Sequence, residues 1–150
     1  MEAVRALLAR YCDLMDAGDW DGVGELFRNG VLRSPEGIEL ARGSLSVADF
    51  YRTGTQLHGG SPRTKHLVLN TVIESAGESA ATARSSYVVL QALDGFPLQP
   101  IITGRYVDRF VERDGLWTIA ERTFFVDLAG DLSRHLTYRP GDTPGPPGEI

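Results

Sequence analysis

Cysteine and long apolar runs are scarce in this sequence. The single cysteine, Cys12, excludes an internal disulfide, and its apolar neighbours on a predicted helix indicate a small buried side chain. No stretch approaches the roughly 18 apolar residues that a membrane-spanning helix needs. Arg5 and Arg10 interrupt the first apolar stretch, so the N-terminus lacks the pattern of a signal peptide. We therefore expect no membrane contact and a cytoplasmic location.

Positive charge is also sparse. Of the 15 basic residues only Lys65 is a lysine, the arginines are interleaved with acidic residues, and the formal net charge is −5. A basic run or a basic amphipathic helix, the usual mark of a protein that binds nucleic acid or a membrane surface, is missing. The sequence therefore predicts no nucleic-acid partner.

Motifs for metals, nucleotides and covalent catalysis are missing as well. None of the three histidines has a carboxylate three or four residues after it, as a metal-binding motif would. No glycine-rich loop joins a strand to a helix, and no glycine-flanked sharp turn surrounds Ser85-Ser86. We expect neither a metal nor a cofactor.

The first half of the chain has helical periodicity. Apolar residues recur at helical spacing up to Gly18, and Asp19 is placed to cap a second helix. A short hairpin is predicted around residues 35–37. A third helix is predicted to begin near Ser46 and to end at residues 59–62.

The second half of the chain changes to strand periodicity. Four long strands joined by short turns are predicted at residues 64–75, 80–93, 98–112 and 116–128. Strands of this length must twist and curl, often with bulges. Helices followed by adjacent strands favour an α+β fold. We expect a cone-shaped roll in which three N-terminal helices pack on a strongly curved, mostly antiparallel sheet and enclose a pocket.

The chain is long enough for one domain. We place this domain at residues 1–130. Residues 131–150 are rich in proline and glycine and are expected to form an irregular or disordered C-terminal arm.

Asp16 is the first candidate for chemistry. On a helical wheel Asp16 falls at the edge of the apolar stripe centred on Tyr11, whereas Asp13 lies nearly opposite. A carboxylate at the edge of a partly apolar cavity is desolvated, which suits a general acid or base near neutral pH. The alternative is a solvated aspartate at the end of a helix.

His66 is the second candidate. It shares a strand face with Val68 and Asn70, and both faces of this strand carry apolar residues. A buried histidine needs a hydrogen-bond partner, and histidine is also the side chain that most readily moves protons at neutral pH. The alternative is a structural histidine bound to a backbone carbonyl.

Polar and aromatic residues on the other predicted faces are suited to line a ligand pocket, although plain core packing would also explain them. The proposed ligand contacts are Tyr11, Asn70, Tyr87, Gln91, Tyr106 and Phe125. Arg105, Arg109 and Arg122 have the geometry to bind a ligand carboxylate, but we favour cross-strand ion pairs with Asp108, Glu112 or Glu121. His58 and His135 are expected at the surface.

Several of these segments together resemble a known family. Residues 7–27, which contain Leu7-Leu8-Ala9-Arg10-Tyr11 and Asp16-Ala17-Gly18-Asp19-Trp20, resemble the opening of SnoaL-like proteins. Residues 63–70 and 104–122 resemble the first and the last two long strands of that family. The resemblance covers about residues 3–130. It implies the cone-shaped α+β fold of the nuclear transport factor 2-like superfamily.

The same segments are similar to scytalone dehydratases. In those enzymes an aspartate late in the first helix and a histidine on the first long strand serve acid–base catalysis, and these positions match Asp16 and His66. Met15 departs from the pattern, because that family has a tyrosine there. A second catalytic histidine would fall near Leu90 or Gln91 and is missing. Fold alone does not establish chemistry.

The resemblance and the residues together predict a cofactor-independent dehydratase, isomerase or cyclase that acts on a hydrophobic small molecule. Asp16 and His66 would shuttle the proton, and Asn70 would orient the histidine or the ligand. Two alternatives stay open: a non-catalytic binding or assembly domain, and the small subunit of a ring-hydroxylating oxygenase. An exposed sheet face predicts a homodimer or a trimer.

Overall fold

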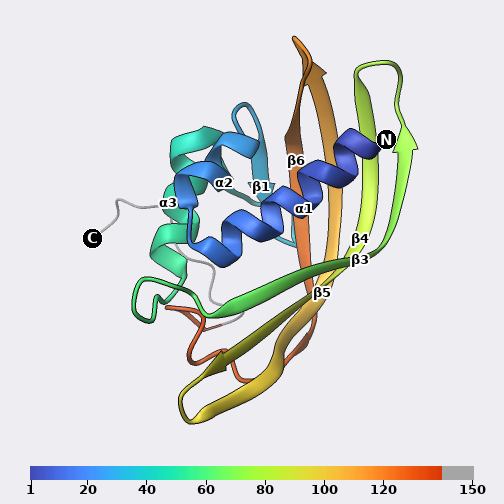
Figure 1. The fold of residues 1–150 in the computed structure, drawn as a ribbon. Helices are drawn as coiled ribbons and strands as arrows, with labels where there is room; N and C mark the ends of the chain where they lie inside the picture. Colours follow the sequence, from blue (N-terminus) through green and yellow to red (C-terminus); the bar gives the residue numbers. More distant parts are fainter. Residues whose placement is uncertain (140–150) are drawn as a thin grey trace.

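The structure is a computed structural model that describes residues 1–139. The helices are α1 (Glu2–Ala17), α2 (Trp20–Leu26) and α3 (Gly43–Gly54). The strands are β1 (Val31–Arg33), β2 (Glu39–Arg42), β3 (Thr64–Ser75), β4 (Ala80–Leu93), β5 (Phe96–Arg113) and β6 (Leu116–Ala129). Figure 1 shows the long strands bending around the space in which the helices lie.

The strands form one open sheet in the order β2-β1-β6-β5-β4-β3. Neighbouring strands are antiparallel except β1 and β6, which run parallel. The three helices pack against this curved sheet, and α1 crosses its long strands (Figure 1). The predicted α+β roll, with three N-terminal helices on a strongly curved, mostly antiparallel sheet, is confirmed.

Bulges in the long strands bend the sheet and change which side chains face the helices. In β6, Ala120 has no partner on β5, because Ile119 and Glu121 pair with consecutive residues of that strand. A bulge of this kind shifts the in-and-out alternation by one residue. Ile119 and Arg122 are consequently both fully buried, although an unbroken strand would place them on opposite faces.

The helix ends follow local chemistry. The Asp19 side chain accepts a hydrogen bond of 2.9 Å from the backbone N–H of Gly22, which confirms the predicted cap of α2. The prediction for α3 was less accurate, since the helix begins at Gly43 rather than near Ser46 and already ends at Gly54. Residues after Gly54 leave the helix because they pair with the end of the chain.

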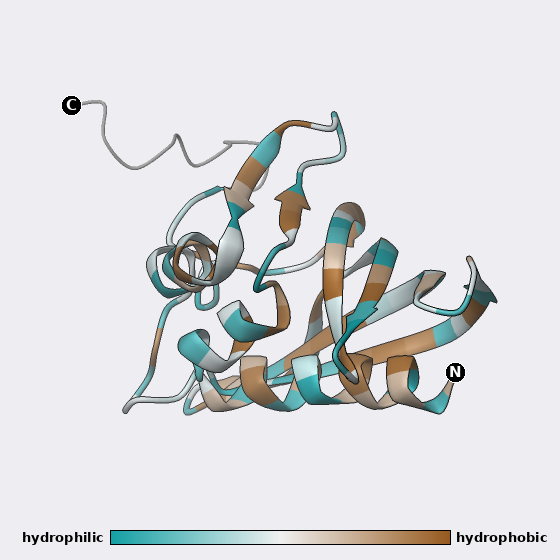
Figure 2. Ribbon diagram, turned by 90° about the horizontal axis from the view of Figure 1, so that it is seen from above, coloured by the Kyte–Doolittle hydropathy of each residue, from teal (hydrophilic) through white to brown (hydrophobic). Residues whose placement is uncertain are grey.

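The apolar stripe of α1 packs against the concave face of the sheet and forms one side of the core. Hydrophobic and hydrophilic residues alternate in bands along this helix (Figure 2). The interpretation of Cys12 is confirmed: it is buried, and burial raises the pKa of its thiol to about 11. The buried residues of α1 are Val4, Leu7, Leu8, Tyr11, Cys12, Leu14 and Met15.

Residues 131–139, here called the C-terminal segment, run alongside the end of α3. The backbone N–H of Gln56 donates to the carbonyl of His135 at 2.8 Å, and the N–H of Thr137 donates to the carbonyl of Gly54 at 3.1 Å. The Gln56 side-chain amide donates to the carbonyls of Ser133 and Leu136. This part of the predicted arm is therefore tied to the domain. The rest of the arm, residues 140–150, lies outside the described residues.

A buried ion pair joins β5 to β6 on the concave face. Arg122 Nε and Nη2 donate to the two carboxylate oxygens of Asp108 at 2.8 and 2.9 Å, and both side chains are 0% exposed. Burial alone would lower the pKa of Arg122, but the Asp108 carboxylate outweighs it and raises that pKa well above its ordinary value. The interpretation of Arg122 as a cross-strand ion partner is confirmed.

The position of this pair predicts its effect on stability. Asp108→Asn leaves the Arg122 guanidinium buried without its counter-charge, so the free energy of unfolding should fall by about 3–5 kcal/mol. Arg105 and Asp127 make a matched control, because this pair also joins β5 to β6 but is exposed. Asp127→Asn should cost less than about 1 kcal/mol. Urea denaturation measures both values, and equal losses would contradict the assignment.

Candidate functional site: an apolar cavity with a histidine–aspartate pair

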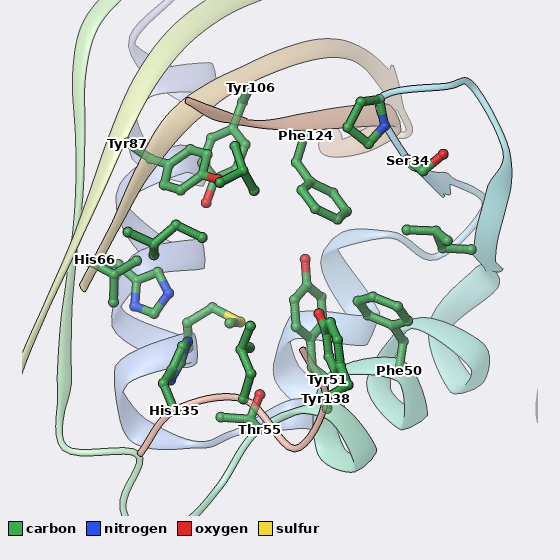
Figure 3. A pocket seen from close by; sticks show the side chains of 18 of the residues that line it. Ser34, Phe50, Tyr51, Thr55, His66, Tyr87, Tyr106, Phe124, His135 and Tyr138 are labelled. Atoms are coloured by element: carbon green, nitrogen blue, oxygen red, sulfur yellow. The ribbon is translucent and has the colours of Figure 1, made fainter. Parts of the chain in front are cut away.

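A cavity of about 330 Å³ lies between the concave face of the sheet, α1, α3 and the C-terminal segment. This volume lies in the range of ordinary small-molecule sites. Its walls are mainly apolar and aromatic, with a few hydroxyl and imidazole groups. Figure 3 shows His66 and His135 at one end of the cavity and Ser34 and Phe50 at the other.

Asp16 and His66 form a hydrogen-bonded pair that joins α1 to β3. His66 Nδ1 lies 2.6 Å from Asp16 Oδ1, and the backbone N–H of His66 lies 3.0 Å from both carboxylate oxygens. The Thr64 hydroxyl donates to Asp16 Oδ1 at 3.1 Å. The start of β3 thus surrounds the carboxylate with three donors, and the sequence-based pairing of the two candidates is present in the fold.

The two members of the pair have different positions relative to the cavity. His66 lines it, whereas Asp16 lies behind the imidazole on the α1 side. A carboxylate that accepts from Nδ1 holds the proton of the neutral ring on that nitrogen, so Nε2 carries a lone pair. This is the arrangement of a base whose orientation and tautomer are set by a carboxylate.

His135 stands beside this pair, and the expectation that it lies at the surface is wrong. Its side chain lines the cavity, the residue is only 6% exposed, and its ring centroid lies 6.3 Å from that of His66. The C-terminal segment turns back over the end of α3 and carries His135 inward. Its position next to a proline- and glycine-rich tail had suggested the opposite.

Phenol groups gather over the buried guanidinium of Arg122. The guanidinium carbon lies 3.8 Å from the ring centroid of Tyr106 and 4.3 Å from that of Tyr11. The Tyr11 and Tyr51 hydroxyls are 3.2 Å apart, and Tyr51 and Tyr106 both line the cavity. Burial raises the pKa of each of these three phenols. They therefore act at neutral pH as uncharged hydrogen-bonding groups.

Tyr87 is fixed by a close approach of two strands. Its ring stacks on Tyr106 with centroids 4.4 Å apart, and its hydroxyl donates to the carbonyl of Phe125 at 2.8 Å. This geometry requires Gly104, because a Cβ there would collide with the Tyr87 hydroxyl and the Phe125 carbonyl. Tyr11, Tyr87 and Tyr106 thus line the cavity, as predicted from their strand and helix faces.

Three other predicted ligand contacts do not line this cavity. Asn70 is exposed at a bulge of β3, where its φ of 53° turns the chain out of register. Gln91 is buried, but its amide donates to the carbonyls of Pro62 and Arg134 and so holds the C-terminal segment. Phe125 packs under Arg105 on the outer face of the sheet, because the bulge at Ala120 shifts the alternation of β6.

Most lining residues were not among the predicted contacts, and Tyr51, Phe124 and His135 are the ones that bear on the proposed chemistry or on the failed predictions. Tyr51 belongs to the apolar stripe of the third helix, which was a usable signal. Phe124 takes the place of Phe125 and would follow from the bulge, which the sequence does not reveal. Nothing local in the sequence indicates that His135 turns inward.

Two negative findings apply to residues 1–139. No cluster of three or more histidine, cysteine, aspartate or glutamate side chains is arranged to hold a metal ion. Within the same range, every helix is too short or too polar to cross a membrane.

Comparison with known protein families places the chain in one of them. The model of the SnoaL-like domain matches residues 1–123, so the chain belongs to the SnoaL-like family, as its motifs had indicated. No curated protein matches the chain.

Solved structures share the fold. A protein of unknown function from Mycobacterium tuberculosis is 29% identical, with a TM-score of 0.68 over 83% of this chain and 70% of that chain. A candidate scytalone dehydratase from Novosphingobium aromaticivorans is 20% identical, with a TM-score of 0.70 over 87% of this chain and 86% of that chain. The beta subunit of a candidate aromatic-ring-hydroxylating dioxygenase from the same organism is 20% identical, with a TM-score of 0.68 over 86% of this chain and 90% of that chain. At 20% identity the last two likenesses concern the fold alone.

The burial of His135 predicts how stability depends on pH. Burial first, and then the neighbouring His66, lowers the pKa of His135 from 6.5 to about 4. Between these values the unfolded chain binds a proton that the folded chain does not, so stability falls as the pH decreases through this range. From pH 7 to pH 5 the wild type should lose about 2 kcal/mol more than His135→Phe does. Denaturation curves at both pH values measure this difference, and equal losses would contradict it.

Proposed function

We propose that this protein is a cofactor-independent acid–base enzyme that moves a proton on an apolar small molecule held in the cavity. The observation that carries the proposal is the Asp16–His66 pair, because its imidazole stands in the wall of an apolar cavity while its carboxylate lies behind. A pair without a catalytic task would not need its free nitrogen beside a ligand-sized space. The reaction classes that fit are dehydration, isomerisation and cyclisation.

The proposed chemistry needs one proton and no redox step. His66 Nε2 removes a proton from a carbon next to a carbonyl or hydroxyl-bearing carbon, and Asp16 stabilises the imidazolium that forms. The same proton then goes to a leaving hydroxyl, which departs as water, or to another carbon of the ligand. The neutral phenol of Tyr51 is placed to donate a hydrogen bond to an oxygen on which negative charge develops.

A general probe of such a base is 5-nitrobenzisoxazole. Removal of its ring C–H proton breaks the N–O bond and releases a coloured phenolate, so no native substrate is needed. We expect the wild type to accelerate this elimination and His66→Gln to lower kcat/KM by about 10²-fold or more. Asp16→Asn should cause a smaller loss, because the ring keeps its place but loses the carboxylate that sets its tautomer.

The matched control is Asp13→Asn, which removes a carboxylate from the exposed face of the same helix. Its kcat/KM should equal that of the wild type. Circular dichroism should show that both proteins are folded. If the wild type is then no faster than His66→Gln, His66 is ruled out as a base for ligands in this cavity. A loss in Asp13→Asn equal to that in Asp16→Asn would remove Asp16 from the proposal.

We further propose that the outer face of the sheet forms the interface of a homodimer. Val72 on β3 and Val107 on β5 both pair with Arg84 of β4, so they flank it on this face, and both are exposed. Leu69 on the same face is exposed as well. Apolar side chains gathered on one sheet face are typical of a protein interface. The likeness to a dioxygenase beta subunit supports assembly of this fold in general.

Charge introduced at this face should separate the subunits. We expect light scattering to give the mass of a dimer for the wild type and of a monomer for Val107→Arg, because the new guanidinium would be buried in the interface beside that of Arg84. Leu45→Arg is the control, since Leu45 is an exposed apolar residue on α3, away from this face. A monomeric wild type, or dissociation by Leu45→Arg alone, would contradict the proposed interface.

A further inference from the structure

The cavity carries almost no charge. Among its described lining residues there is no lysine or arginine, and the single carboxylate is that of Glu36 in the β1–β2 hairpin. The nearest buried guanidinium, that of Arg122, is neutralised by Asp108 and covered by the rings of Tyr11 and Tyr106. A ligand carboxylate or phosphate would find no counter-charge here. The cavity therefore fits an uncharged ligand.

His135 has a buried polar atom without a partner. Its Nδ1 is inaccessible to solvent and forms no hydrogen bond within residues 1–139. Because solvent cannot reach Nδ1, a ligand cannot reach it either, so Nε2 is the nitrogen of this cavity-lining ring that can contact a ligand. Unpaired buried N–H groups are rarer in native proteins than unpaired acceptors, which favours the proton on Nε2. Burial and the neighbouring His66 lower the pKa of His135 to about 4, so the ring is neutral at pH 7. A neutral imidazole offers one N–H and one lone pair.

The backbone around His135 is held from several sides. Its own N–H donates to the carbonyl of Leu132 at 3.0 Å, and its carbonyl accepts from the N–H of Gln56 at 2.8 Å. The carbonyl of the preceding residue, Arg134, accepts from the Gln91 amide at 3.0 Å and lies 2.7 Å from His58 Nε2. The imidazole is thus positioned by the scaffold, although its side chain makes no structural hydrogen bond through Nδ1.

We propose that His135 is a second ligand-binding residue of the cavity and that it donates a hydrogen bond to a hydroxyl or carbonyl oxygen of a neutral apolar ligand. The two rings enter the same end of the cavity (Figure 3). His66 keeps its proton on Nδ1 toward Asp16, so the single lone pair on its Nε2 stays free for the proton transfer proposed above. The Nε2–H of neutral His135 donates to the ligand oxygen. A hydrocarbon of the same shape has no acceptor for this donor.

The proposal rests on the proposed function in one respect, since both place a small molecule in the same cavity. It adds the substrate class, an uncharged compound with an apolar body and a hydroxyl or carbonyl oxygen. It also adds a residue from the C-terminal segment, which lies beyond the span matched by the family model.

The test uses three probes of one shape: 2-naphthol, naphthalene and 2-naphthoate. Isothermal titration calorimetry should give the wild type about tenfold higher affinity for 2-naphthol than for naphthalene, because a good hydrogen bond in an apolar site contributes about that factor. Binding of 2-naphthoate should be undetectable. In His135→Phe the affinity for 2-naphthol should fall to that for naphthalene, and the affinity for naphthalene should stay unchanged.

Two further variants distinguish a direct role of the His135 ring from an effect of the segment that carries it. His135→Gln, which keeps a donor, should recover part of the preference for 2-naphthol. His58→Gln changes a histidine outside the cavity that contacts the same segment, and it should keep the full preference. The thermal melting temperature of His135→Phe should equal or exceed that of the wild type, because the unpaired buried nitrogen is gone.

Three outcomes would overturn the proposal. The first is a wild type that does not prefer 2-naphthol to naphthalene. The second is an equal loss of affinity for both probes in His135→Phe. The third is a loss of the preference in His58→Gln as large as that in His135→Phe. The elimination assay separates this proposal from the proposed function. If the protein prefers 2-naphthol but does not accelerate the elimination, the His135 subsite is supported and the proposed enzyme is contradicted. If it accelerates the elimination but shows no preference for 2-naphthol, the enzyme is supported and the subsite is contradicted.

Discussion

The buried pair of Arg122 and Asp108 is the interaction on which the cavity depends. It fixes the register of β5 against β6 in the middle of the concave face, where both side chains are shielded from water. The guanidinium also packs against the rings of Tyr11, from α1, and Tyr106, from β5. A charge buried this deeply is tolerated only with its partner in place. It therefore sets how closely α1 can approach the sheet and where the floor of the cavity lies.

A second carboxylate, that of Asp16, joins two of the elements that form the cavity walls. Asp16 joins α1 to the start of β3 through a backbone N–H, a hydroxyl and an imidazole, so the histidine that reaches the cavity is oriented by the same contact that docks the helix. Asp16 therefore serves both the packing of α1 on β3 and the proposed chemistry. The C-terminal segment then completes the wall with His135, and the phenols supply uncharged polar contacts. The result is an apolar space with polar atoms at a few fixed points.

The similarity to scytalone dehydratases is partial, and the structure shows where it departs. Leu90 and Gln91 supply no second histidine on β4. A second imidazole, that of His135, nevertheless stands 6.3 Å from His66, but it comes from the C-terminal segment. Gln91 instead holds that segment through the carbonyl of Arg134. A search along the strands alone would therefore miss one of the two imidazoles that the cavity contains.

The sequence by itself determined the order of elements, the curvature expected of long strands, the cap at Asp19 and the closeness of Asp16 to His66, because these follow from periodicity, local turn chemistry and family motifs. Only the tertiary structure decided which residues face the cavity. The bulges of β3 and β6 turn Asn70 and Phe125 away from it, and the hydrogen bonds of the C-terminal segment bring His135 in. A bulge shifts the alternation by one residue, and the inward turn depends on contacts with a strand and a loop some 40–80 residues earlier in the chain. Neither effect leaves a mark on the local sequence.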